Sequence, residues 1–468
     1  MDFQTQLADF LKPANLRSPV LESLVSHLSS LLLGLACFVI FLLPAAMRGE
    51  SLKAGVARVD ITPPVGVRMW GYQSRKGPSI GTRDPLYARV LVLEAGGKRL
   101  AFAILDLGRD FGPASLAKLK AATRSDVNYL VTAAIHTHSG PFISDEYPGG
   151  TPAWETADLG KIASAVHMAS SHLVDAKLGV GYGAVYIGHN RLRRNPDGTV
   201  SWFQRNPTRI PTAPVDPTVA VLRVDTADGK PLAILVYYAC HAVVFGPSNL
   251  KYSADYPGVM DRVVRQAFGG QPLAFFVQGA AGDINPYYAV TPLQQDAVRD
   301  REWTGRRLGE EAARVARNIH TESVPDPSIQ FAEDYLTFHL RWNARKWRQA
   351  LIASYGPAAA QHRRVQTVFK APVTTILINK RIAILGMPGE PFIDFQKSWR
   401  DRCPVWDCLF MGYTNGYFGY LPTMRAASWG GYGAGNDATR LEVGAGNRML
   451  EGARQICEMK SCDRLHSI

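Results

Sequence analysis

From residue 51 onward, short apolar runs alternate with longer amphipathic stretches. The apolar runs predict buried strands, and the stretches with helical periodicity between them predict helices. The predicted strands are Ala88–Leu93, Leu100–Leu105, Asn128–Ile135, Leu232–Tyr238, Leu273–Val277, Thr374–Ile378, Ile382–Leu385 and Cys408–Gly412. The predicted helices are Pro113–Ala122, Thr156–Leu173, Tyr256–Phe268, Asp296–Ile319 and Pro391–Arg400. This alternation predicts an α/β fold in which a mixed central sheet is flanked by helices.

A hairpin signal interrupts this alternation near the middle of the chain. Asn195-Pro-Asp-Gly198 is a strong turn sequence for a tight β-hairpin. We therefore expect a small β-rich lobe beside the main α/β sheet.

Residues 1–50 differ in kind from the rest of the chain. Leu28–Ala46 is a nearly unbroken apolar stretch without charge, and it ends before Arg48. About 20 apolar residues can span a bilayer as a helix, and Pro44-Ala45-Ala46 supplies the small residues of a signal-peptide cleavage site. We interpret residues 1–50 as a signal or anchor segment. The catalytic part is then expected to be exported, periplasmic or extracellular, and held at the membrane by this helix if it stays uncleaved. A buried soluble helix is the alternative, although the segment has no polar face.

Composition and charge indicate which kinds of binding partner the protein can have. The 468 residues are 46% hydrophobic and 20% charged, which is typical of a globular protein. The formal net charge of +12 comes from scattered lysines and arginines, so no nucleic-acid-binding arm is predicted. The charge is compatible with an affinity for acidic surfaces or anionic lipid head groups. We expect a small-molecule or lipid substrate and no nucleic acid.

Four of the six cysteines lie late in the chain, as two pairs with the same spacing: Cys403 with Cys408, and Cys457 with Cys462. In an oxidising compartment they predict one or two disulfides that tie down the C-terminus, with the pairing open. A second zinc site of four thiolates is the alternative, but a C-x4-C spacing is loose for a structural zinc cage.

Two histidines directly follow the strand predicted over Asn128–Ile135. His136 and His138 are two residues apart, and side chains at that spacing on an extended chain point to the same face. Paired imidazoles at the end of an apolar strand suit a metal ion with a neighbouring acid/base group. The alternative is one buried, hydrogen-bonded histidine and one surface histidine.

Other candidate ligands also come just after predicted strands. His241 follows Leu232–Tyr238, Glu390 follows Ile382–Leu385, and Tyr413, Tyr417 and Tyr420 follow Cys408–Gly412. Side chains beyond the strand ends of an open α/β sheet converge on one crevice, so we expect the active site there. Two histidines, a carboxylate and one more oxygen ligand suit catalytic Zn²⁺, which keeps a position open for water. Glu390 could instead stabilise the N-terminus of the helix that begins at Pro391.

A set of motifs resembles one known family. The motifs are Ala54–Gly66 with Trp70-Gly-Tyr72, Asp84–Arg89, His136–Pro141, Gly282–Pro286, Pro388–Glu390 and Asn415–Tyr420. In this order they resemble the catalytic domain of the neutral, non-lysosomal ceramidases and their bacterial relatives. The resemblance implies that residues 51–468 form one zinc hydrolase domain. It also implies cleavage of an N-acyl amide bond, of ceramide or a ceramide-like lipid, by metal-activated water.

The resemblance also assigns roles to individual residues. The zinc ligands fall on His136, His241, Glu390 and Tyr420. His138 becomes the candidate acid/base group, and the candidates for stabilising the oxyanion or binding a polar head group are Arg191, Asn285 and Tyr432.

Two departures from the family pattern leave the substrate open. Ceramidases of this family carry a serine, held to be central to catalysis, at the position of Asn285. Asparagine cannot act as an alkoxide nucleophile, but its amide can donate to a developing oxyanion, so a mechanism based on zinc and water stays open. The chain also ends too soon for the C-terminal immunoglobulin-like domain that ceramidases usually carry. The alternatives are a zinc hydrolase of an ester or an N-acylated sugar or amino compound, and a membrane-tethered binding protein without catalysis.

Overall fold

The computed structural model describes residues 50–462, apart from residues 148, 356–364 and 436. Glu50–Ile468 group as one compact unit. The predicted signal or anchor segment lies outside the described residues up to position 49, so its role stays a prediction. Among the helices that the structure describes, none has the length and apolar character needed to cross a bilayer.

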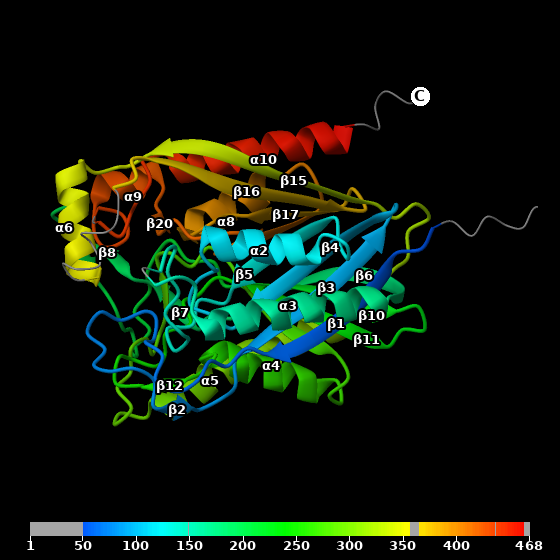
Figure 1. Ribbon diagram of the computed structural model, residues 1–468, viewed down its shortest axis with the longest axis horizontal. Helices are drawn as coiled ribbons and strands as arrows, with labels where there is room; N and C mark the ends of the chain where they lie inside the picture. Colours follow the sequence, from blue (N-terminus) through cyan, green and yellow to red (C-terminus); the bar gives the residue numbers. More distant parts are fainter. Residues whose placement is uncertain (1–49, 148, 356–364, 436, 463–468) are drawn as a thin grey trace, which may run out of the picture. The chain divides into compact units, whose positions relative to one another are not determined.

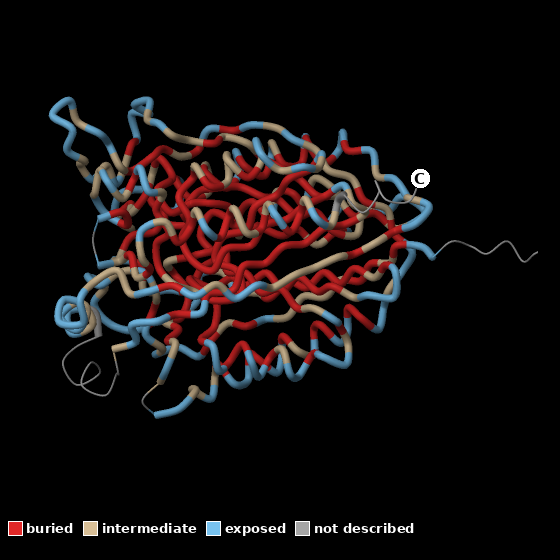
Figure 2. The backbone as a smooth tube through the Cα atoms, turned by 90° about the horizontal axis from the view of Figure 1, so that it is seen from above, coloured by how far each residue is buried: buried red, intermediate tan, exposed pale blue. Residues whose placement is uncertain are grey.

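The largest element is an eight-stranded mixed sheet with the strand order β13-β11-β10-β6-β1-β3-β4-β5 (Figure 1). Neighbouring strands are antiparallel, except for the parallel pairs β4–β5 and β11–β13. The apolar runs predicted as strands here are buried at almost every residue (Figure 2), which requires cover on both faces. The strands are β1 (Lys53–Asp60), β3 (Tyr87–Ala95), β4 (Lys98–Leu105), β5 (Tyr129–Ala134), β6 (Val174–Ala184), β10 (Thr218–Thr226), β11 (Pro231–Tyr238) and β13 (Leu273–Gln278).

Helices cover one face of this sheet. A Cβ at Gly55 of β1 would come within 2.0 Å of the backbone oxygen of Ala169, so the missing side chain lets helix α3 approach the strand closely. A Cβ at Gly179 of β6 would likewise come within 2.4 Å of the side chain of Ile319, which follows α5. The register between β1 and β6 puts both glycines on the same face, so α3 and α5 share it. The helices of this layer are α2 (Pro113–Thr123), α3 (Ala153–Ser171), α4 (Tyr256–Ala267) and α5 (Ala297–Arg317).

A four-stranded sheet packs against the opposite face, with the order β15-β16-β17-β19. Its alternate side chains enter different cores. Ile376 and Ile384 join the core of the large sheet, whereas Leu377 and Leu385 pack with residues of α8 (Ile393–Arg402) and α10 (Ala445–Cys462). The layers therefore follow the order helices, large sheet, small sheet, helices, and α10 lies along the small sheet in Figure 1. The strands are β15 (Ile329–His339), β16 (Val368–Ile378), β17 (Ile382–Gly386) and β19 (Asp407–Met411).

Short two-stranded sheets connect the segments that follow these strands. The pairs are β2 (Gly81–Thr82) with β12 (Lys251–Tyr252), β7 (Gly188–Asn190) with β14 (Ile284–Pro286), β8 (Leu192–Arg194) with β9 (Val200–Trp202), and β18 (Glu390–Pro391) with β20 (Tyr420–Leu421). The β8–β9 hairpin turns at the predicted sequence Asn195–Gly198, where the amide of Asn195 donates to the carbonyl of Thr199 at 2.8 Å. The short helices α6 (Ala344–Tyr355) and α9 (Met424–Trp429) lie on the same side of the molecule in Figure 1.

The predicted fold class is confirmed: a mixed sheet with flanking helices and several small extra sheets. Each predicted strand and helix has a counterpart, with shifted ends. The helix predicted from Pro391 begins at Ile393, because Pro391 belongs to β18.

The predicted disulfides are not formed in the structure. Cys403, Cys408 and Cys457 are free thiols, and the side chain of Cys462 lies outside the described part.

Candidate active site

The predicted site residues meet at the carboxyl ends of strands from both sheets. His136 follows β5, His241 follows β11, and Glu390 opens β18 after β17. Strands β5 and β13 are the two edges of the large sheet, and the Gln278 amide at the end of β13 donates to the carbonyl of Ile135 at 3.1 Å. This contact joins the two edges at their carboxyl ends and so brings His136 beside His241.

Three donor atoms converge at one point. Oε2 of Glu390 lies 3.1 Å from Nε2 of His241 and 3.3 Å from Nε2 of His136. The Nδ1 atoms of both histidines hydrogen-bond to the backbone. Nδ1 of His136 lies 2.5 Å from the carbonyl oxygen of Gly108, and Nδ1 of His241 lies 2.6 Å from that of Ala281. A neutral imidazole has one N–H, so both Nε2 atoms present lone pairs to a carboxylate oxygen. A divalent cation that takes nitrogen and oxygen ligands fits this arrangement.

The protonation of the site agrees with such a role. Burial and the charge of Arg191 lower the pKa of His241 to about 3, so the ring is neutral. Neutral imidazole and ionised carboxylate are the forms that bind a metal.

His138 completes a group of three histidines. The ligand atoms of His136, His138 and His241 all lie within 4.8 Å of one another, which makes this group able to hold a metal ion. Nε2 of His138 is 3.2 Å from Nε2 of His136, and its Nδ1 is buried without a hydrogen-bond partner. A Cβ at Gly71 would lie 2.5 Å from that Nδ1, so a glycine is needed where the backbone covers the ring. The acid/base role of His138 stays a prediction.

Tyr420 lies beside Glu390 in the β18–β20 pair. Its hydroxyl accepts a hydrogen bond from Nη2 of Arg191 at 2.8 Å. This contact orients the hydroxyl, and its role as the fourth ligand stays a prediction.

Arg191 forms one wall of the site and is 4% exposed. The β7–β14 pairing brings it beside Asn285, whose Oδ1 accepts from Nη1 at 3.0 Å. Nη2 also donates to the carbonyl of Gly282 at 2.6 Å, and Nη1 lies 3.4 Å from Nε2 of His241. A fixed positive charge therefore faces the convergent donors.

Both ends of the Asn285 amide group are hydrogen-bonded within the protein. Its Oδ1 faces Arg191, and its Nδ2 donates to the carbonyl of Gln204 at 2.8 Å. One amide hydrogen is thus committed to the backbone, and a role as oxyanion donor, which stays a prediction, would use the other.

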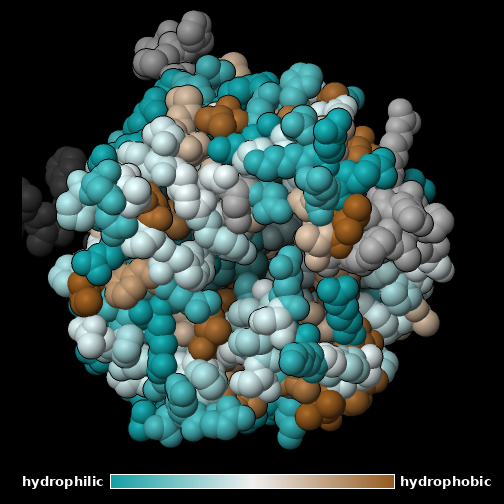
Figure 3. Space-filling view, turned by 90° about the vertical axis from the view of Figure 1, so that its left-hand side faces the viewer, coloured by the Kyte–Doolittle hydropathy of each residue, from teal (hydrophilic) through white to brown (hydrophobic). Residues whose placement is uncertain are grey.

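Tyr432 and Trp202 lie on the outer side of Arg191. Their rings are 4.8 Å apart, and the guanidinium lies 4.9 Å from the ring of Trp202 and 5.5 Å from that of Tyr432. Both are partly exposed, at 42% for Trp202 and 44% for Tyr432. Figure 3 shows the face toward which β8 and α9 lie; it is hollowed at its centre and mostly hydrophilic around the hollow. Tyr432 can therefore meet a substrate at the surface, next to Arg191.

Tyr417 was a candidate ligand together with Tyr413 and Tyr420, but its contact was not predicted: its hydroxyl donates to Oε1 of Glu390. Its ring lies edge-on to Trp70 at 5.5 Å. The nearby ring of Tyr413 stacks on His136 at 4.2 Å instead. The sequence indicated that these tyrosines lie near the site, because they all follow one predicted strand. Their spacing alone could not assign the contact that each of them makes.

Asp283 was also missed, and it holds three segments of the site together. Its Oδ1 accepts from the amide of Ile393 at 2.8 Å, and its Oδ2 from Nδ2 of Asn190 at 2.7 Å. Its carbonyl accepts from the amide of Arg191 at 2.9 Å. The carboxylate therefore fixes the start of α8, just after Glu390, against the strand that precedes Arg191.

Residues 52–301, more than half of the chain, match the family described as neutral/alkaline non-lysosomal ceramidase, N-terminal. The chain belongs to this family. Among curated ceramidases, the neutral ceramidase of Pseudomonas aeruginosa is 27% identical over 283 residues, which are 55% of this chain and 40% of that protein. The neutral ceramidase of Mycobacterium tuberculosis is 28% identical over 286 residues, which are 55% of this chain and 43% of that protein. The matched region covers less than half of each relative.

Solved ceramidase structures share the fold. The crystal structure of neutral ceramidase from Pseudomonas aeruginosa superposes with a TM-score of 0.67 at 18% identity, over 88% of this chain and 75% of that one. A ceramidase complexed with C2 gives a TM-score of 0.66 at 18% identity, over 87% of this chain and 75% of that one. At this identity the likeness establishes a shared fold alone.

The hydrogen bond from Tyr417 to Glu390 allows a first test of metal binding at this site. We expect Tyr417→Phe to weaken metal binding by about 10- to 100-fold, because it removes the hydroxyl that orients Glu390. A competition titration with a zinc indicator measures this change. Tyr335→Phe is the matched control, because Tyr335 also donates to a glutamate, Glu333 at 2.7 Å, but is 58% exposed. Equal zinc affinities in the two variants would contradict the assignment.

Proposed function

We propose that this protein is a zinc-dependent hydrolase that cleaves an N-acyl amide bond, with ceramide or a ceramide-like lipid as its substrate class. The observation that carries the proposal is the convergence of Nε2 of His136, Nε2 of His241 and Oε2 of Glu390, with both Nδ1 atoms held by carbonyls. Membership of the ceramidase family supports amide hydrolysis as the reaction.

His136, His241, Glu390 and Tyr420 would hold the ion. When bound, Zn²⁺ supplies Lewis acidity and lowers the pKa of water to about 7, which gives a nucleophile at neutral pH. Tyr417 keeps Glu390 in the orientation that ligation needs, and the carbonyl of Gly108 does the same for His136.

The other residues act on the acyl group and the leaving amine. His138, next to His136, would pass a proton to the leaving amine. Arg191 would stabilise the negative charge that develops on the acyl oxygen, because its guanidinium is buried and fixed before the reaction. Asn285 orients Arg191, and Tyr432 would contact the polar part of the substrate at the surface.

A second candidate is a zinc hydrolase of an ester or of an N-acylated sugar or amino compound. One observation favours it: by the family resemblance, Asn285 stands at the position of the serine that the ceramidases carry.

The place of action is also a proposal. The apolar stretch Leu28–Ala46 supports export of the enzyme to the periplasm or the extracellular space. If that stretch stays uncleaved, it would hold the enzyme at the membrane that contains its lipid substrate.

The test compares three substrates with and without metal. A fluorogenic short-chain N-acyl amide, the matched ester and a fluorescent ceramide are assayed before chelation, after chelation and after zinc is added back. We expect chelation to reduce amide hydrolysis more than about 100-fold and zinc to restore it. Faster turnover of the ester or of a polar amide would favour the second candidate. Bound zinc without turnover of any substrate would make the protein a binding module, and turnover that resists chelation would contradict the metal.

A further inference from the structure

The segment that joins β4 to α2 touches both sides of the convergent donor set. The carbonyl oxygen of Gly108 lies 2.5 Å from Nδ1 of His136. A Cβ at Gly108 would come within 2.0 Å of the Trp70 ring, so the indole packs directly on this backbone. The same indole lies 5.5 Å from the ring of Tyr417, whose hydroxyl donates to Glu390. One short segment therefore supports His136 directly and approaches Glu390 through two aromatic rings.

Arg109, the next residue of this segment, lies against the ring of Tyr417. Its guanidinium carbon is 4.8 Å from the centre of that ring, and the residue is 3% exposed. A guanidinium over the face of an aromatic ring is attracted by the ring electrons, and the attraction is stronger where water is excluded. Trp70 is nearly perpendicular to the same ring, at 89°. Two neighbours thus restrict how the Tyr417 ring can turn.

The guanidinium of Arg109 is itself held in place. Its Nε donates to the carbonyl of Asp110 at 3.0 Å, and its Nη2 donates to Oδ1 of Asp145. Oδ2 of Asp145 accepts a further hydrogen bond from Nη1 of Arg440 at 3.1 Å, so this carboxylate is fixed from two sides. Hydrogen bonds between charged groups are strong and geometrically specific. The guanidinium is therefore kept over the Tyr417 ring.

The backbone next to Tyr417 is fixed by a different residue, Asp110. Its Oδ2 accepts from Oγ1 of Thr132 in β5 at 2.6 Å and from the amide of Gly416 at 3.1 Å. These bonds tie the loop that carries Tyr417 to the edge of the large sheet. Because Asp110 holds the loop and Arg109 contacts the ring, loss of the Arg109 side chain should release the ring and leave the loop in place.

We propose that Arg109 is a positioning residue of the metal site, which acts through Tyr417 to keep Glu390 in the orientation that ligation needs. This inference rests on the proposed function, because it assumes that Glu390 binds the ion. Arg109 restrains the ring, and the hydroxyl of that ring donates to Oε1 of Glu390. Oε2 then stays directed at Nε2 of His136 and of His241. Residues that orient ligands from outside tune the affinity for the metal.

The test is a double-mutant cycle of Arg109→Met and Tyr417→Phe, measured as zinc affinity by competition with a zinc indicator. Methionine keeps apolar volume over the ring and removes the charge. We expect Arg109→Met to weaken zinc binding by about 3- to 10-fold, which is less than the effect of Tyr417→Phe. In the Tyr417→Phe background it should have almost no further effect, because the ring no longer carries the hydroxyl that Arg109 orients. A purely structural role would weaken binding equally in both backgrounds.

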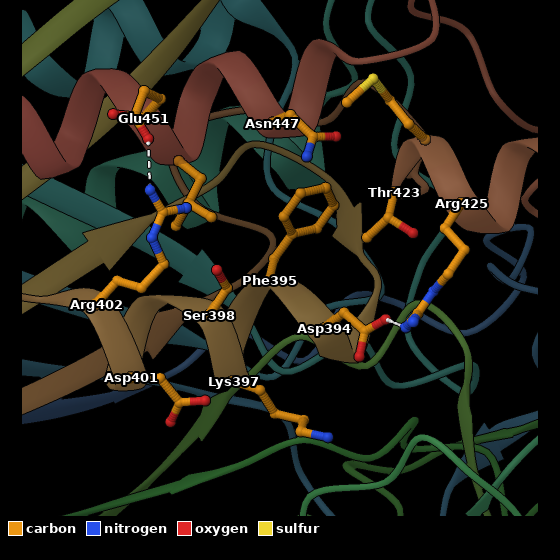
Figure 4. Close-up of a pocket in the computed structure, with 12 residues that line it drawn as sticks. Asp394, Phe395, Lys397, Ser398, Asp401, Arg402, Thr423, Arg425, Asn447 and Glu451 are labelled. Carbon is orange, nitrogen blue, oxygen red and sulfur yellow. Dashed lines mark hydrogen bonds and ion pairs between the residues drawn. The ribbon is translucent and has the colours of Figure 1, made fainter.

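Two further variants serve as controls. Arg109→Lys keeps a positive charge near the ring and should retain part of the affinity. Arg425→Met is the matched control, because Arg425 also pairs with an aspartate, Asp394 (Figure 4), and lies 5.3 Å from the centre of an aromatic ring, that of Trp429. Its side chain is 59% exposed, and it covers a tryptophan instead of the tyrosine that donates to Glu390. We therefore expect Arg425→Met to bind zinc as the wild type does.

The outcomes separate this inference from the proposed function. A wild type that binds no zinc would overturn both. A loss of affinity in Tyr417→Phe with wild-type affinity in Arg109→Met would overturn the role of Arg109 alone. Equal losses from Arg109→Met in both backgrounds, or an equal loss in Arg425→Met, would overturn it as well. Melting curves check that the variants fold, and if Arg109→Met does not, the same cycle with Arg109→Lys decides.

Discussion

The variant His241→Ala should lose its bound metal and more than about 10³-fold of its kcat/KM for the amide substrate. The substitution removes the Nε2 that lies 3.1 Å from Oε2 of Glu390. It leaves an ionised, buried carboxylate with one imidazole fewer around it. Elemental analysis of the purified variant measures the metal, and the fluorogenic amide measures the rate.

The control for this variant is His320→Ala, because His320 is exposed and follows helix α5, away from the convergent donors. We expect it to keep both the metal and the rate. A melting curve beside that of metal-free wild type separates loss of the ion from loss of the fold. Full metal occupancy and wild-type turnover in His241→Ala would contradict the assigned ligand set.

The second large effect is expected at Arg191. Arg191→Ala should lower kcat by about 10²- to 10³-fold, which is typical for the loss of one donor that stabilises an oxyanion. The variant should keep its metal, because the three convergent donors remain. It should also lose about 1–3 kcal/mol of stability, since the buried hydroxyl of Tyr420 and the carbonyl of Gly282 lose their partner. Steady-state kinetics and denaturant unfolding check the two parts.

Two further variants sharpen this test. Arg191→Lys keeps the charge but cannot reproduce the forked contacts, so we expect only partial recovery of kcat. Arg193→Ala removes an exposed arginine two residues away and should leave kcat unchanged. If Arg191→Ala raises KM at constant kcat, Arg191 binds the ground state and does not stabilise the transition state.

The fold could be predicted where the sequence carries continuous apolar runs. Strands β4, β5, β11 and β13 are buried on both faces and were predicted for that reason. Strand β6 was missed, because its glycines at 179, 181 and 183 weaken the strand signal, and their role in admitting α5 is visible only in three dimensions. Strand β15 was missed because its apolar residues are interrupted by polar ones and do not form a continuous run, and most of the strand is not buried.

The site residues could be predicted from local spacing, from their places after strands and from the family resemblance, but most of their contacts could not. His136 and His138 follow a buried strand, which placed them at the end of a sheet. The order of the tyrosines could not be resolved, because Tyr413 and Asn415 adopt left-handed backbone conformations, with φ of 56° and 53°. These turns break the two-residue period and aim Tyr417 at Glu390.

Contacts between segments that are distant in the sequence could not be predicted either, because no local pattern indicates them. Asp283 touches the backbone of Ile393 and the side chain of Asn190, and nothing in its own motif indicates either partner. The same holds for Gly71, whose backbone covers His138 from a loop far away in the chain.

In the proposed enzyme, one divalent ion binds where Nε2 of His136, Nε2 of His241 and Oε2 of Glu390 converge. Anomalous diffraction above and below the zinc edge, on crystals of the purified protein, tests it most directly. We expect a single zinc peak within bonding distance of all three atoms, and no such peak in His241→Ala. Zinc bound only elsewhere, or Glu390 hydrogen-bonded directly to protonated histidines with no ion between them, would contradict it.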